Sequence, residues 1–170
     1  LALLATTGIA GLMAQGHEAH QSSDDRPYWR LAVIVGHTFI PAEHSGEYTA
    51  VPSWGLDLEY WFRPRWAVAL HNDLEIESYV VRGENGEDIH RQFPLVLTLD
   101  LLWMPVGGLI LMAGPGWELE ANENLQLIRF GAEYEFHLPG HWDISPTIFY
   151  DSRHDAYDTW SVGLGVGKRF

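Results

Sequence analysis

The feature of this sequence that most constrains its fold is a period-two alternation of apolar and polar residues. Successive side chains of a β-strand point to opposite faces of the sheet, so this alternation predicts strands with one apolar face. It recurs in eight segments, near residues 28–40, 50–62, 66–81, 91–104, 108–120, 124–137, 141–151 and 157–170. No apolar run of transmembrane-helix length follows the first fifteen residues, which argues against a helical membrane protein.

The last segment, WSVGLGVGKRF, indicates which solvent the apolar face meets. Trp160, Val162, Leu164 and Val166 share one face, whereas the other face carries the glycines at 163, 165 and 167. In a soluble sheet, the face opposite the core would carry solvated side chains rather than three glycines. The pattern favours a strand whose small face looks into a narrow lumen and whose apolar face contacts lipid.

The connections between the predicted strands alternate in length. RPR at 63–65, PVG at 105–107 and LPG at 138–140 are short, whereas PAEHSGEYT and RGENGEDIH are longer, polar and acidic. Short turns on one side and longer loops on the other are typical of transmembrane barrels. We therefore predict an all-β fold, an eight-stranded antiparallel up-and-down transmembrane β-barrel over residues 28–170, with both termini on the short-turn side.

Outward-facing aromatic residues support this interpretation because they gather at two heights. One predicted girdle, about 25 Å from the other, holds Trp29, Phe62, Trp66, Trp103, Phe136, Trp142 and Phe170. The other holds Phe39, Trp54, Phe93, Trp117, Tyr150 and Trp160. Soluble barrels have no reason to place aromatics in this way.

With these features the chain resembles the small eight-stranded bacterial outer-membrane β-barrels, the OmpA-, OmpX- and OmpW-like barrels and the porin-like outer membrane protein β-barrel family, over residues 28–170. The resemblance implies a Gram-negative outer-membrane location with periplasmic termini. It also implies that the insertion machinery reads an assembly signal in the last strand, formed by Phe170, Val166, Leu164 and Val162. Lys168 departs from the pattern by placing a charge on the lipid face, from where it can reach the headgroups.

The residues before the barrel predict export. Residues 1–14 form a short apolar run ending in small residues, which indicates the remnant of a secretory signal peptide cleaved after Ala14. An N-terminal helix of the folded domain is the alternative. Residues 15–27 are polar, and we expect a flexible segment.

Charge decides what the interior can hold. Ten Lys and Arg against 23 Asp and Glu give a net charge of −13, which argues against a nucleic-acid partner. The predicted inward positions hold three arginines, Arg30, Arg129 and Arg169, and one histidine, His71. They also hold many acids, namely Asp57, Glu59, Asp73, Glu75, Glu77, Asp100, Glu118, Glu120, Glu133, Glu135, Asp143 and Asp151. A lumen of this width is filled by side chains, so we expect a polar, acid-rich plug whose excess carboxylates are hydrated, protonated or bound to cations.

Two sharper functions compete with a structural or surface-interaction role in the envelope. A divalent cation could bind the inward groups His71, Asp73, Glu75 and Glu77, with Glu118 and Glu120, or the N-terminal pair His17 and His20, which would make a narrow cation-binding or cation-permeable barrel. Catalysis would need Ser152 with His154 and Asp155, or His71 with Asp73, and neither set has a family motif. We expect no enzyme activity and no cofactor, with outer-membrane lipid and the insertion machinery as partners.

Overall fold

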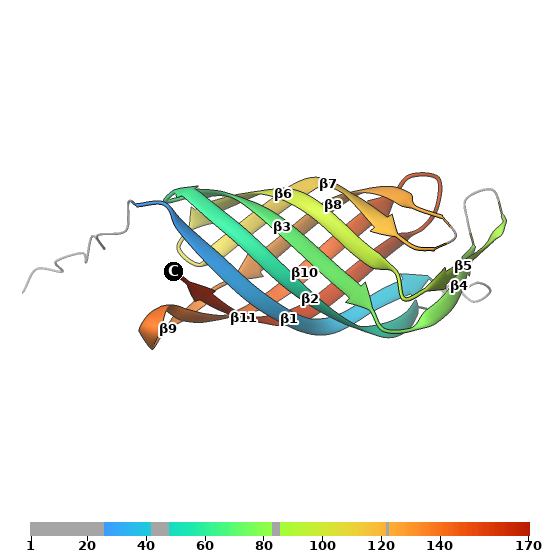
Figure 1. The fold of residues 1–170 in the computed structure, drawn as a ribbon, viewed down its shortest axis with the longest axis horizontal. Helices are drawn as coiled ribbons and strands as arrows, with labels where there is room; N and C mark the ends of the chain where they lie inside the picture. The colour runs from blue at the N-terminus through green and yellow to red at the C-terminus, as the bar shows by residue number, and fades with distance from the viewer. Residues whose placement is uncertain (1–25, 42–47, 83–85, 122) are drawn as a thin grey trace, which may run out of the picture.

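The computed structural model describes residues 26–41, 48–82, 86–121 and 123–170 (Figure 1). The predicted signal remnant at 1–14, His17, His20 and almost all of the polar segment at 15–27 lie outside the described residues. None of the described residues forms a helix that is long and apolar enough to cross a membrane.

Eight strand positions close into an antiparallel barrel, which confirms the predicted fold class. In chain order they are β1 (Tyr28–Pro41), β2 (Tyr48–Arg63), β3 (Trp66–Glu75), β6 (Leu95–Val106), β7 (Leu109–Leu119), β8 (Leu125–Tyr134) continued by β9 (Phe136–Leu138), β10 (Trp142–Arg153) and β11 (Asp158–Arg169). A short 3-10 turn, η1 (Pro139–His141), connects β9 to β10. Because β11 pairs with both β10 and β1, the sheet has no free edge, and both ends of the barrel chain lie at the same end of the molecule (Figure 1).

The third and fourth predicted strands, 66–81 and 91–104, are wrong in their outer parts. The barrel strand β3 stops at Glu75, and the chain continues into β4 (Ser78–Arg82), which pairs with β5 (Asp88–Gln92) as a separate two-stranded sheet. The return passes through Phe93, whose φ of 47° is left-handed, and through Pro94, whose carbonyl accepts a 3.1 Å hydrogen bond from the amide of Glu75. The alternation is broken at residues 76–77, so Glu77 is exposed rather than inward as predicted.

Burial alternates along the barrel strands as the sequence pattern requires. On β1, for example, Leu31, Val33 and Val35 are exposed, whereas Arg30 and Ile34 are buried. Large apolar side chains are exposed all around the barrel, and such a continuous apolar surface is stable only against lipid or another apolar partner.

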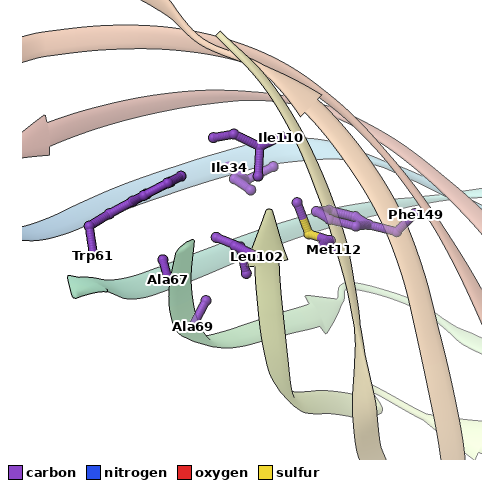
Figure 2. Close-up of a cluster of buried hydrophobic side chains, with 8 residues drawn as sticks. All are labelled: Ile34, Trp61, Ala67, Ala69, Leu102, Ile110, Met112 and Phe149. Carbon is purple, nitrogen blue, oxygen red and sulfur yellow. The ribbon is translucent and has the colours of Figure 1, made fainter. Parts of the chain in front are cut away.

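The interior is less polar than the sequence suggests. A cluster of buried apolar side chains fills part of the lumen, formed by Ile34, Trp61, Ala67, Ala69, Leu102, Ile110, Met112 and Phe149 (Figure 2). A second cluster lies where the β4–β5 hairpin meets the barrel, formed by Ile40, Val51, Val81, Ile89, Leu125, Ala156 and Tyr157. The interior therefore combines charged groups with two apolar clusters.

Candidate functional site: the charged interior of the barrel

We describe the interior from the end that carries the chain termini, called the lower end, towards the end that carries the β4–β5 hairpin, called the upper end. The lowest charged cluster surrounds Arg30 of β1. Its guanidinium donates to Asp143 of β10, at 2.7 Å from Nη2 to Oδ1 and 3.1 Å from Nε to Oδ2. It also contacts Glu59 of β2, Glu133 at 3.4 Å and Glu135 at 3.2 Å, and all five side chains are buried. One cation thus faces four carboxylates, and we name this group the Arg30 cluster.

A glycine of β11 makes room for this arginine. A Cβ atom on Gly167 would lie 2.6 Å from Arg30 Nε and 2.6 Å from Asp143 Oδ1, closer than real contacts allow. The structure thus explains one of the inward glycines of the last strand: the Arg30 guanidinium occupies the space that a side chain at Gly167 would fill. Below the cluster, Arg169 contacts Glu135 and donates to His137 Nδ1 at 2.9 Å.

The middle of the barrel holds a buried histidine between two aspartates. His71 Nδ1 lies 2.6 Å from Asp100 Oδ2, and its Nε2 lies 3.9 Å from Asp57 Oδ2. Thr98 donates to the same oxygen of Asp100 at 2.6 Å. Within the described part of the chain, the second oxygens of Asp57 and Asp100 are buried without a hydrogen-bond partner. Carboxylate oxygens in that situation require a proton, a cation or water.

A second arginine satisfies the remaining carboxylates at mid-height. Arg129 of β8 donates to both oxygens of Asp151 of β10, at 2.7 Å and 2.8 Å, and contacts Asp73 of β3. Its guanidinium also lies 4.6 Å from the ring centroid of Phe149, which belongs to the apolar cluster of Figure 2. This fork-to-fork pair joins two neighbouring strands, and the contact with Asp73 crosses the interior to a strand that is not a neighbour.

The upper cluster contains two arginines that the sequence analysis missed. Arg153 of β10 contacts Glu118 of β7 and lies 3.8 Å from Glu75. Arg91 of β5 lies 2.6 Å from the same Glu118 and 3.6 Å from Glu120. Arg153 comes two residues after Asp151 and therefore faces the same side of the strand. Extending the seventh predicted strand by two residues would have predicted that Arg153 faces inward. Arg91 lies two residues before the break at Phe93, so the alternation of the barrel strand that follows does not indicate its direction.

The predicted cation ligands are therefore placed in separate groups. His71 belongs to the aspartate pair, Asp73 to Arg129, and Glu75 with Glu118 and Glu120 to the two upper arginines. Tyr79 and Tyr157 also donate to Glu75 and Glu118, respectively. Among the described residues, the carboxylates that come together with metal-ligand spacing are Glu59, Glu133 and Glu135, within 4.8 Å of one another, and Arg30 already lies against them. Metal binding at the predicted residues stays a prediction.

The predicted catalytic groups of the last outer loop lie on the surface. His154 Nδ1 is 2.8 Å from Asp155 Oδ2, with 76% and 69% of these side chains exposed. Such a pair lacks the buried support that orients a catalytic base. The second candidate pair, His71 and Asp73, is divided between the two mid-height groups.

Comparison with known proteins supports the fold alone. No protein-family model matches the chain, and no curated protein matches it. Solved structures do: Ail, the attachment invasion locus protein of Yersinia pestis, in complex with the heparin analogue sucrose octasulfate, matches with a TM-score of 0.60 and 14% identity over 85% of this chain and 99% of that one.

Two barrels from Pseudomonas aeruginosa match comparably. The outer membrane protein OprG has a TM-score of 0.56 and 16% identity, over 84% of this chain and 96% of that chain. The N-terminal barrel domain of OprF has a TM-score of 0.54 and 14% identity, over 83% and 97%. The chain therefore has the fold of the eight-stranded outer-membrane β-barrels.

Proposed function

We propose that this protein is a bacterial outer-membrane barrel with a plugged, acid-rich interior that serves a structural or surface-interaction role in the Gram-negative envelope. It is exported by an N-terminal signal peptide, and its termini face the periplasm. The apolar outer surface and the likeness to outer-membrane barrels support this location. The short turns at the termini end support the orientation.

The main observation in support of a plugged interior is that buried ion pairs follow one another along the barrel axis. Arg30, Arg129 and Arg153 each bridge strands at a different height, and apolar side chains fill space between them. An eight-stranded barrel is only wide enough to be filled by such side chains. A protein built in this way blocks solute flow and acts through its rigidity and its surfaces.

Planar-bilayer recording tests this proposal. The folded protein should produce no stable conductance steps, because buried ion pairs and apolar side chains fill the lumen. A matched pair of variants sharpens the result: Arg129→Ala removes a lumen-filling side chain, whereas Arg65→Ala removes an exposed one. Conductance in the wild type would contradict the plug, and conductance appearing with Arg129→Ala alone would locate the obstruction.

A narrow cation-permeable barrel is the second candidate, favoured by the unpartnered oxygens of Asp57 and Asp100. In that case the wild type conducts, prefers cations over anions, and loses that preference in Asp57→Asn with Asp100→Asn. Catalysis has no comparable observation in its favour.

The surface role must suit the charges that the protein exposes. Ail, a structural neighbour, is seen with a sulfated heparin analogue. Here the end that carries the β4–β5 hairpin exposes acids such as Glu87, Asp88 and Glu123. We therefore expect cationic rather than polyanionic partners at that end.

A further inference from the structure

The exposed charges that the structure describes are separated between the two ends of the barrel. Among residues whose side chains the structure describes, the exposed Lys and Arg all lie at the termini end, and they are Arg26, Arg63, Arg65 and Lys168. The exposed Asp and Glu all lie at the opposite end, and they are Glu77, Glu87, Asp88, Glu123, Asp155 and Asp158. The acids of the termini end, such as Glu135 and Asp143, point into the lumen and are buried.

These four cations, which we name the basic rim, lie beside the aromatic girdle of the same end. Trp66, directly after the Arg63–Arg65 turn, stacks with Trp103 at 6.1 Å between ring centroids. Lys168 Nζ lies 4.9 Å from the ring centroid of Trp142, and Trp29 packs on Tyr60. Such outward tryptophans lie at the level of the lipid headgroups, so the rim cations reach the same level.

We propose that the basic rim is a binding surface for the phosphate groups of anionic phospholipids in the leaflet that surrounds the termini end. This rests on the proposed membrane location. The rim exposes cations with no exposed acidic side chain of the described residues beside them, so the described side chains of this end present positive charge to a partner. Cations near a membrane surface attract anionic lipids additively, and arginine binds phosphate with two parallel hydrogen bonds.

The test measures which lipid surrounds the folded protein. The wild type is folded into phosphatidylcholine vesicles, with and without phosphatidylglycerol, and folding is checked by heat-dependent gel mobility. Spin-labelled phosphatidylglycerol and phosphatidylcholine then report the relative association of each lipid by electron paramagnetic resonance. We expect at least about a threefold preference for phosphatidylglycerol at low salt, falling as ionic strength rises.

Three variants separate the rim from net charge. The rim variant Arg63→Gln, Arg65→Gln, Lys168→Gln should lose the preference. The matched variant Glu87→Gln, Asp88→Asn, Glu123→Gln neutralises three charges at the other end and should keep it. Combining all six substitutions restores the wild-type net charge, and the preference should remain lost. If the rim variant folds poorly, Arg63→Gln with Arg65→Gln, confined to the turn region, should lower the preference in part.

The outcomes distinguish this proposal from the membrane location itself. A wild type that folds into vesicles but associates equally with both lipids overturns lipid binding by the rim and leaves the location standing. A preference that returns in the six-substitution variant also overturns it, because net charge then explains the effect. A wild type that folds into neither vesicle overturns the location, and the rim proposal with it.

Discussion

Trp29 and Phe170 exchange two backbone hydrogen bonds, at 3.0 Å from Trp29 N to Phe170 O and 2.9 Å from Phe170 N to Trp29 O. The terminal residue thus continues the β1–β11 ladder beyond Arg30 and Arg169, while its ring is exposed. Phe170 has a structural role in closure in addition to its predicted role in the assembly signal.

Deleting Phe170 should therefore lower the yield of folded protein in the outer membrane, because both the signal and the last ladder bonds are lost. Folded yield is measured by heat-dependent mobility of membrane fractions. Phe170→Tyr keeps the backbone and an aromatic ring, so its yield should stay near that of the wild type. An unchanged yield after deletion would leave Phe170 as an ordinary girdle residue.

Replacing Arg30 by Met should be strongly destabilising, by about 3–5 kcal/mol, because buried carboxylates lose their counter-ion. Unfolding by urea in phosphatidylcholine vesicles, which contain no anionic lipid for the basic rim, gives the free energy of unfolding. The loss should shrink as the pH falls, since protonated carboxyls no longer repel one another. The exposed Arg65→Met is the control and should change stability by less than about 0.5 kcal/mol. Equal effects of the two substitutions would contradict the Arg30 cluster.

Gly167→Ala should destabilise the barrel by roughly 1–3 kcal/mol, because its Cβ overlaps Arg30 and Asp143. The matched control is Gly107→Ala, where an added Cβ meets nothing within 4 Å. Urea unfolding of both variants checks the difference. If both are neutral, the guanidinium does not occupy the space beside β11.

A plug and a cation site differ in their response to ions. In a plug, Glu118→Gln lowers the melting temperature, because Arg91 and Arg153 lose a shared counter-ion, whereas the exposed Glu77→Gln has little effect. Chelator or millimolar Ca²⁺, Mg²⁺ or Zn²⁺ should not shift the wild type beyond general screening. A shift of several degrees that Glu75→Gln and Glu118→Gln abolish would instead establish ligand binding to the native state.

The apolar exterior predicts that the mature protein stays in solution only with detergent or lipid. Boiled and unboiled samples should migrate differently on denaturing gels, as stable barrels do. A monodisperse monomer in plain buffer, measured by light scattering, would be the contrary result.

The sequence alone predicts the barrel because alternation reports which face of a strand each residue occupies, and it does so for most strands here. Alternation does not indicate where a strand ends and the inward and outward positions change over. For this reason the sequence pattern places Glu77 inward and does not identify Arg91 as an inward residue. Nor does it give the register between strands, which brings Arg30 to Asp143 across 113 positions of sequence. The acids of the lumen were found in this way, but their partners depend on contacts between distant strands.

The glycine face of β11 leaves the register of this closing strand ambiguous in its middle part, so residues near the ends of the strand must specify it. Gly163, Gly165 and Gly167 repeat every second residue, so sliding β11 by two positions would offer Arg30 the same empty space, whereas a slip of one would drive Val166 or Lys168 into it. The non-glycine inward residues of β11 help to distinguish the alternatives. Ser161 meets Thr38 at 3.0 Å at one end, and Arg169 meets Glu135 at the other. Two polar contacts at opposite ends of β11 therefore favour the correct register of the closing strand.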